Sequence, residues 1–188
     1  MSPLEIIASA LGAWAVWLTV RQNRWCWPLG LIMVLMYAWI FYNGKLYSNM
    51  LLQGIYAVLQ GYGWWQWTRG GSSQNGVHVS RLSPQSIQLS LAIGAVGALV
   101  LGYLMATFTD ATAPWQDAAL SAFSLVAQVW MAQKRVECWP LWIVLDLLFV
   151  ALFVQQGLYP TALLYGVFTL LAISGWLTWR RDRALADA

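Results

Sequence analysis

Long runs of apolar residues, separated by short polar stretches, dominate the pattern of the sequence. Seven of these runs come close to the roughly 20 residues that a transmembrane helix needs. They cover residues 4–20, 27–43, 46–67, 86–109, 116–132, 139–155 and 158–179. Lipid offers the backbone no hydrogen-bond partner, so continuous apolar runs of this length predict helices. The pattern therefore predicts an all-α membrane protein with seven transmembrane helices.

Composition and charge support a membrane location and give an orientation. Only 9% of the residues are charged, compared with about 25% in soluble domains. If the seven spans alternate in direction, nine of the ten basic residues lie on one side and only Lys45 on the other. The positive-inside rule then predicts an N-terminus outside and a C-terminus in the cytoplasm. The basic residues border helices and form no continuous stripe, which argues against a nucleic-acid partner.

The two ends of the chain resemble each other at an offset of 112 residues. Cys26-Trp27-Pro28-Leu29 aligns with Cys138-Trp139-Pro140-Leu141, and Gly63-Trp64 with Gly175-Trp176. Fixed-period similarity indicates a repeated structural unit. We therefore predict a duplicated unit of three helices.

This duplication divides the chain into three parts. The first repeat covers residues 1–69 and the second, with a basic tail, covers 116–188; residues 70–115 form a cytoplasmic loop and a linker helix. One linker helix between two three-helix units predicts a 3+1+3 arrangement of parallel repeats. The stretch 70–85 is rich in Gly, Ser, Asn and Gln, and this composition predicts a mobile loop.

Asp146 is the only charged residue deep within an apolar run. A carboxylate inside a bilayer is costly unless it faces a cavity or a partner, so it indicates a functional site. Trp139, Trp142 and Asp146 follow i, i+3, i+7 spacing and share one helix face. The aligned positions in the first repeat hold Gly30 in place of Trp142 and Val34 in place of Asp146. An asymmetric binding site between the repeats is therefore predicted, although Asp146 as a protonated acid bonded to a neighbouring helix stays open.

Other polar residues within the spans extend the candidate site. Gln53, Tyr56 and Gln60 share one face of the third span, and Tyr165 in the seventh span aligns with Gln53. Such side chains either contact a ligand or bond neighbouring helices to each other. Tryptophans near span ends are typical of interfacial belts. This applies to Trp25, Trp67, Trp115 and Trp179, and Trp139 fits either a belt or the site.

The remaining chemistry favours transport over catalysis. Cys26 and Cys138 lack further ligands for a metal, His78 is alone in a polar loop, and no nucleotide-binding or metalloprotease motif is present. An intramembrane enzyme would need a second catalytic group near Asp146, and none is evident. We expect no cofactor and no metal, and a small-solute carrier is favoured over an enzyme or a receptor.

The Trp139-x-x-Trp142-x-x-x-Asp146 motif, the repeated Trp-Pro-Leu and the stretch Leu46-Tyr47-x-x-x-Leu51-Leu52-Gln53 resemble the PnuC family of bacterial vitamin transporters. The resemblance implies a seven-helix fold of the SWEET-like 3+1+3 type in the inner membrane. It also implies facilitated diffusion of a vitamin that a cytoplasmic kinase traps by phosphorylation. A homo-oligomer stays open.

The resemblance leaves the substrate open among three vitamins. Family members carry nicotinamide riboside, thiamine or riboflavin, with Asn or Asp at the last motif position, where this chain has Asp146. Nicotinamide riboside and thiamine are flat aromatic cations that suit indole faces and a carboxylate. We expect nicotinamide riboside as the substrate, with thiamine as the alternative. A proton-coupled carrier that uses Asp146 is the mechanistic alternative.

Overall fold

The computed structural model describes residues 3–43, 47–71, 76–109, 113–155 and 157–186, and these residues are almost entirely helical. The seven-helix, all-α prediction is confirmed. The helices are α1 (Pro3–Val20), α2 (Cys26–Asn43), α3 (Tyr47–Arg69), α4 (Pro84–Phe108), α5 (Pro114–Ala132), α6 (Cys138–Gln155) and α7 (Tyr159–Ala186).

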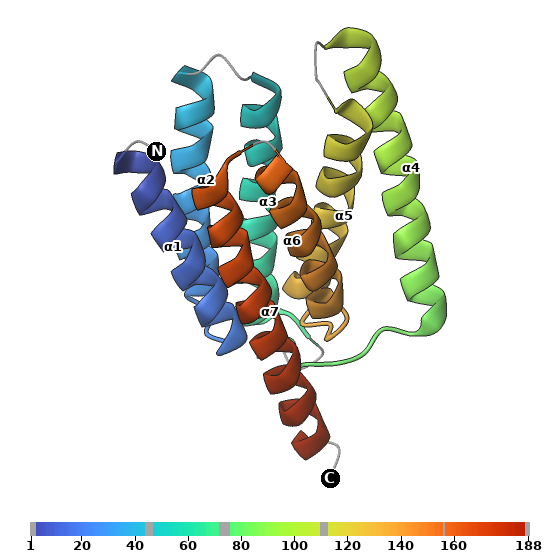
Figure 1. The fold of residues 1–188 in the computed structure, drawn as a ribbon. Helices are drawn as coiled ribbons and strands as arrows, with labels where there is room; N and C mark the ends of the chain where they lie inside the picture. Colours follow the sequence, from blue (N-terminus) through green and yellow to red (C-terminus); the bar gives the residue numbers. More distant parts are fainter. Residues whose placement is uncertain (1–2, 44–46, 72–75, 110–112, 156, 187–188) are drawn as a thin grey trace.

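Six of these helices form a closed ring. Going around it, α1 packs on α2, α2 on α3, α3 on α5, α5 on α6, α6 on α7, and α7 on α1. Helix α4 stands outside the ring and packs on α5 alone among the described helices (Figure 1). The first three helices thus meet the last three along two seams, α3 with α5 and α1 with α7.

Apolar character is unevenly distributed among the helices. By length and composition, α4, α6 and α7 are able to cross a bilayer, and α1 and α2 contain the shorter apolar stretches Ile6–Val20 and Cys26–Ile40. Helices α3 and α5 are less apolar because they carry Gln and Ser residues. Polar groups within a membrane bundle are favourable where they line a cavity, and the cavity described below contains several of them.

Close packing of α4 on α5 depends on two glycines. Gly94 and Gly102 are buried. A side chain on Gly94 would press tightly against Phe123, and one on Gly102 would collide with Trp115 of α5. Small residues let membrane helices approach closely. The rest of α4 exposes apolar side chains such as Ile93.

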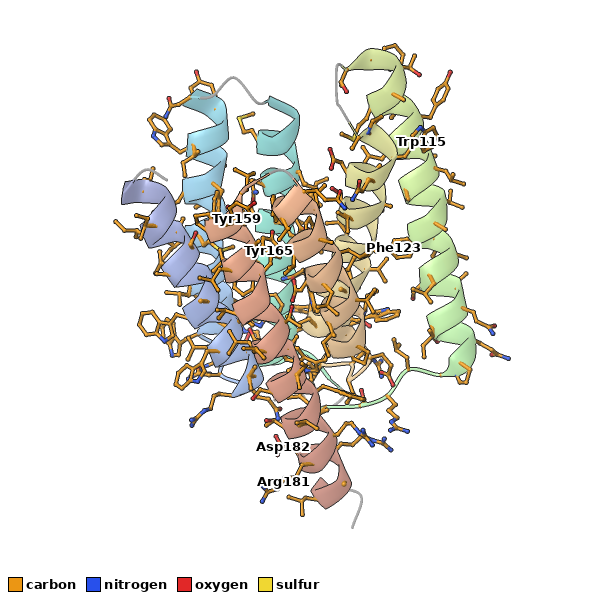
Figure 2. The ribbon with its side chains drawn as sticks, viewed as in Figure 1. Trp115, Phe123, Tyr159, Tyr165, Arg181 and Asp182 are labelled. Atoms are coloured by element: carbon orange, nitrogen blue, oxygen red, sulfur yellow. The ribbon has the colours of Figure 1, made fainter. Side chains whose placement is uncertain are left out.

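The described basic residues gather at one end of the bundle. Helices α1, α3, α5 and α7 end there, and α7 continues past the ring with Arg181 and Asp182 on its extension (Figures 1 and 2). Gln22, in the turn after α1, donates a hydrogen bond from Nε2 to Asp182 Oδ2 at 2.6 Å. Lys45 lies outside the described residues.

The composition of residues 70–85 predicts a mobile loop after α3, but residues 76–83 of this segment are docked at the basic end of the bundle. The Val77 N–H donates to Gln66 O at 3.1 Å, and the Ser80 N–H donates to Lys134 O at 3.1 Å. Ser80 O accepts a hydrogen bond from the Val136 N–H at 3.0 Å. These bonds tie the segment to α3 and to the turn between α5 and α6. The local composition gave no sign of these distant partners.

Two tryptophans predicted for interfacial belts are instead buried at the seams. Trp67 donates from Nε1 to Ala132 O at 3.0 Å across the α3–α5 seam. Trp179 donates from Nε1 to Val20 O at 3.2 Å across the α7–α1 seam. Both donors and both acceptors are related by the 112-residue offset. Equivalent bonds of this kind support a duplicated unit, and the duplication stays a prediction. Trp25 and Trp115, by contrast, are more than half exposed.

A candidate substrate cavity inside the helix ring

A cavity of about 700 Å³ lies inside the ring, and all six ring helices contribute to its wall. No residue of α4 lines it. Its volume falls within the roughly 300–1,000 Å³ typical of small-molecule sites. Both halves of the chain therefore surround one space.

A cluster of buried tryptophans closes the basic end of this cavity. Trp27 packs edge-on against Trp67 with ring centroids 5.5 Å apart, and Trp139 packs in the same way against Trp179 at 5.2 Å. All four side chains are at most 6% exposed. Near the other end, the wall includes Leu158, whose side chain is 46% exposed. Four buried aromatic side chains therefore close the cavity at the basic end.

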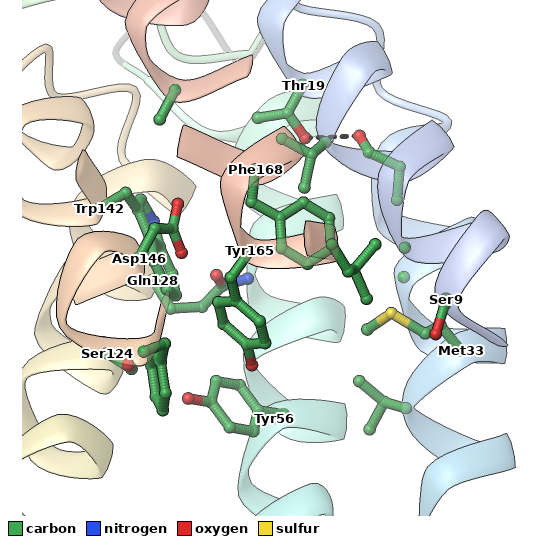
Figure 3. Close-up of a pocket in the computed structure, with 18 of the residues that line it drawn as sticks. Ser9, Thr19, Met33, Tyr56, Ser124, Gln128, Trp142, Asp146, Tyr165 and Phe168 are labelled. Atoms are coloured by element: carbon green, nitrogen blue, oxygen red, sulfur yellow. Dashed lines mark hydrogen bonds between the residues drawn. The ribbon is translucent and has the colours of Figure 1, made fainter. Parts of the chain in front are cut away.

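The structure places all seven predicted site residues on the wall of this cavity. They are Trp139, Trp142 and Asp146 on α6, Gln53, Tyr56 and Gln60 on α3, and Tyr165 on α7. Helical spacing brings each group to one face, and ring closure turns those faces toward each other. Figure 3 shows Trp142 and Asp146 on one side of the cavity, with Tyr165 and Tyr56 beside them.

Asp146 is a buried carboxylate without a compensating cation. Its side chain is 4% exposed and points into the cavity (Figure 3). Among the described residues, no basic side chain lines the cavity. Tyr165 lies near it in the cavity (Figure 3). A charge in this setting is stabilised by a partner that enters the cavity.

Three indole N–H groups of the cavity wall are also unpaired. The Nε1 atoms of Trp27, Trp139 and Trp142 are buried and have no hydrogen-bond partner in the described part of the chain. Buried donors are nearly always paired in folded proteins, so each exception calls for an explanation. Their nitrogen atoms are covered by protein atoms, so a ligand in the cavity would pair with one of them only after the indole reorients.

Sequence reasoning missed the contribution of α5. Ser124 and Gln128 line the cavity and are 3% and 8% exposed. Tyr56 directs its hydroxyl toward Ser124 (Figure 3). Ser124 and Gln128 lie four residues apart in the fifth span and therefore share one helix face, and this spacing was the signal that could have identified them.

Aromatic side chains form another part of the cavity wall, and of these the sequence predicted only the central one, Tyr165. Tyr165 lies 4.8 Å from Phe149 and 5.5 Å from Phe168 between ring centroids. Phe149 and Phe168 also line the cavity. Phenylalanines in apolar spans carry no distinctive signal, which is why these two were not predicted.

A membrane helix bundle that encloses a polar and aromatic cavity of this size is suited to binding a small solute, as a carrier requires. Comparison with known proteins agrees and specifies the family. The sequence model of the nicotinamide mononucleotide transporter family matches residues 2–181. The chain belongs to this family, which includes PnuC. It is therefore a vitamin transporter and not an enzyme.

Individual relatives cover nearly the whole chain. The nicotinamide riboside transporter PnuC of Escherichia coli is 26% identical over 97% of this chain and 88% of its own length. The riboflavin/roseoflavin transporter RibM of Streptomyces davaonensis is 28% identical over 95% of this chain and 86% of its own. A crystal structure of the vitamin B3 transporter PnuC matches with a TM-score of 0.76 and 26% identity, covering 95% of this chain and 80% of the other.

Proposed function

We propose that this protein carries nicotinamide riboside across the bacterial inner membrane by facilitated diffusion. The observation that carries the proposal is the buried carboxylate of Asp146 beside the indole of Trp142, in a cavity whose described wall holds no basic side chain. Nicotinamide riboside is a flat aromatic cation that bears hydroxyls and a carboxamide. The cavity offers a matching group for each of these features.

Each part of this vitamin has a counterpart on the cavity wall. The pyridinium ring stacks on Trp142, an attraction worth about 0.5–2 kcal/mol. Asp146 neutralises the ring charge and accepts hydrogen bonds from ribose hydroxyls. The amides of Gln60 and Gln128 provide further hydrogen bonds.

Thiamine is the second candidate, and Asp146 is the observation in its favour. Its thiazolium is also a flat cation and suits the same carboxylate and indole. Riboflavin is neutral and would leave the Asp146 charge buried without a partner, which is unfavourable. The RibM relative nevertheless makes riboflavin a necessary arm of the test.

The chemistry available in the chain supports passive transport. No nucleotide-binding motif is present in the sequence, and Asp146 is the single acid on the described cavity wall. A passive carrier only equalises the electrochemical potential of its solute across the membrane, so phosphorylation of the vitamin by a cytoplasmic kinase would maintain inward flow. A proton-coupled carrier with Asp146 as the proton site is the rival mechanism.

The clustered basic residues support an orientation for the carrier. Their end of the bundle faces the cytoplasm under the positive-inside rule, which places the N-terminus outside. The tryptophan-sealed end of the cavity is then the cytoplasmic end. Transport requires this end to open in alternation with the other.

Direct binding tests the proposal. Purified protein is titrated with nicotinamide riboside, thiamine and riboflavin side by side, and nicotinamide riboside should bind most tightly. Preferential binding of thiamine would assign the second candidate. Preferential binding of riboflavin, or binding of none of the three, would contradict the proposal.

A further inference from the structure

Gly30 lies directly against the amide of Gln60. A β-carbon built on Gly30 would lie 2.8 Å from both Gln60 Nε2 and Gln60 Oε1. Gly30 and Gln60 both line the cavity, and the Gln60 side chain is only 8% exposed. The Gln60 amide therefore occupies the space in which a side chain at position 30 would lie. This contact changes the interpretation of Gly30, which sequence alignment had marked only as the small counterpart of Trp142.

The 112-residue offset shows an exchange of large and small residues between the two halves. Gly30 and Gln60 correspond to Trp142 and Ala172, and all four line the cavity. On the first half, the large side chain comes from α3. On the second half, it comes from α6. The amide and the indole thus enter the cavity from different helices.

Helix geometry places the two large groups at similar depth. Gly30 and Trp142 each lie four residues after the start of their helices, and both helices start at the basic end. Asp146 lies one turn farther along α6, about 6 Å farther from that end. An aromatic ring stacked on Trp142 would therefore lie at about the depth of the Gln60 amide, with Asp146 toward the other end of the cavity.

We propose that Gly30 is a specificity-determining residue because it positions the Gln60 amide. In this position, the amide selects a ligand whose aromatic ring carries a group with both a hydrogen-bond donor and an acceptor, such as a carboxamide. The inference rests on the proposed function. It adds a residue that touches no ligand and acts through Gln60. An amide side chain has donors and an acceptor, so it is able to pair with a carboxamide through both.

Glycine at position 30 has no evident role in the helix itself. Alanine is the better helix former, by about 1 kcal/mol, so Gly30→Ala should not weaken α2. The clash involves the far end of a flexible side chain, which is able to move. Gly30→Ala should therefore fold and displace the Gln60 amide. Gly61→Ala is the matched control, because a β-carbon on Gly61 of α3 has no other atom within 4 Å.

Two ligands and a rescue variant test the inference. Gly30→Ala should bind nicotinamide riboside about three- to tenfold more weakly, as expected for one lost hydrogen bond. It should bind N-ribosylpyridinium, which lacks the carboxamide, as the parent does. In a Gln60→Asn background, whose shorter side chain leaves room for the new methyl group, Gly30→Ala should weaken binding no further. Gly61→Ala should bind both ligands like the parent.

Several results would overturn the inference. These are unchanged nicotinamide riboside binding in Gly30→Ala, equal weakening toward both ligands, additive losses in the double variant, or unfolding of Gly30→Ala. A parent that does not bind nicotinamide riboside would overturn the proposed function and this inference together. A parent that binds it while Gly30→Ala behaves like Gly61→Ala would overturn this inference alone.

Discussion

Replacing Asp146 with Asn should weaken binding of nicotinamide riboside about tenfold to a hundredfold. The carboxylate is 4% exposed, so an effective dielectric constant of about 20 suits it better than that of water. A cation about 6 Å away is then attracted by about 3 kcal/mol. Desolvation of the cation offsets part of this attraction, which leaves about 1.5–2.5 kcal/mol. Asn keeps the shape and a hydrogen-bond acceptor but removes the charge.

A neutral ligand separates the role of the charge from the role of shape. The dihydro form of nicotinamide riboside has nearly the same outline and no positive charge, so Asp146→Asn should bind it about as well as the parent does. Asp117→Asn is the matched control, because Asp117 of α5 is not on the cavity wall. Isothermal titration of each variant with both ligands gives the comparison. Equal affinity of parent and Asp146→Asn for the cation would refute the reasoning.

Three further predictions concern the ring, the packing and the orientation. Trp142→Ala should weaken binding of the cation by about 0.5–2 kcal/mol in titrations, and a full-affinity variant would exclude stacking. Gly175→Ala should lower the melting temperature because the added methyl group collides with the buried Trp139 ring. The control Gly166→Ala should not lower it, because position 166 has open space around it. Equal melting temperatures of the two variants would contradict the packing described. A reporter fused after Arg183 should be active only in the cytoplasm, and an external signal would reverse the orientation.

The apolar runs predicted the helices well because lipid allows few alternatives to a helix. The run 139–155 corresponds to α6 within one residue. The last run was the exception, since α7 continues to Ala186 through a charged stretch. Hydropathy alone does not register such an extension, because it lies past the apolar run. The Gln22–Asp182 hydrogen bond contacts this extension from the turn after α1.

The cavity wall was predictable only where a residue stands out from its surroundings. Asp146 was recognisable because one charge in an apolar run is costly. Ser124 and Gln128 were missed because they are uncharged, and neutral polar side chains in a span also serve to bond neighbouring helices. The burial of Trp67 and Trp179 was missed because their partners are backbone carbonyls about 65 and 159 residues away. No local pattern reports such contacts, and only the closed ring explains them.

Uptake into sealed vesicles tests the central claim, passive transport of a cationic vitamin, most directly. Purified protein is reconstituted into liposomes, and labelled nicotinamide riboside is added outside at zero membrane potential. The internal concentration should rise to the external one and stop there, with or without an imposed pH gradient, and Asp146→Leu vesicles should take up little. Accumulation well above the external concentration under a pH gradient would support the proton-coupled rival. Uptake no faster than in protein-free vesicles would contradict the claim itself.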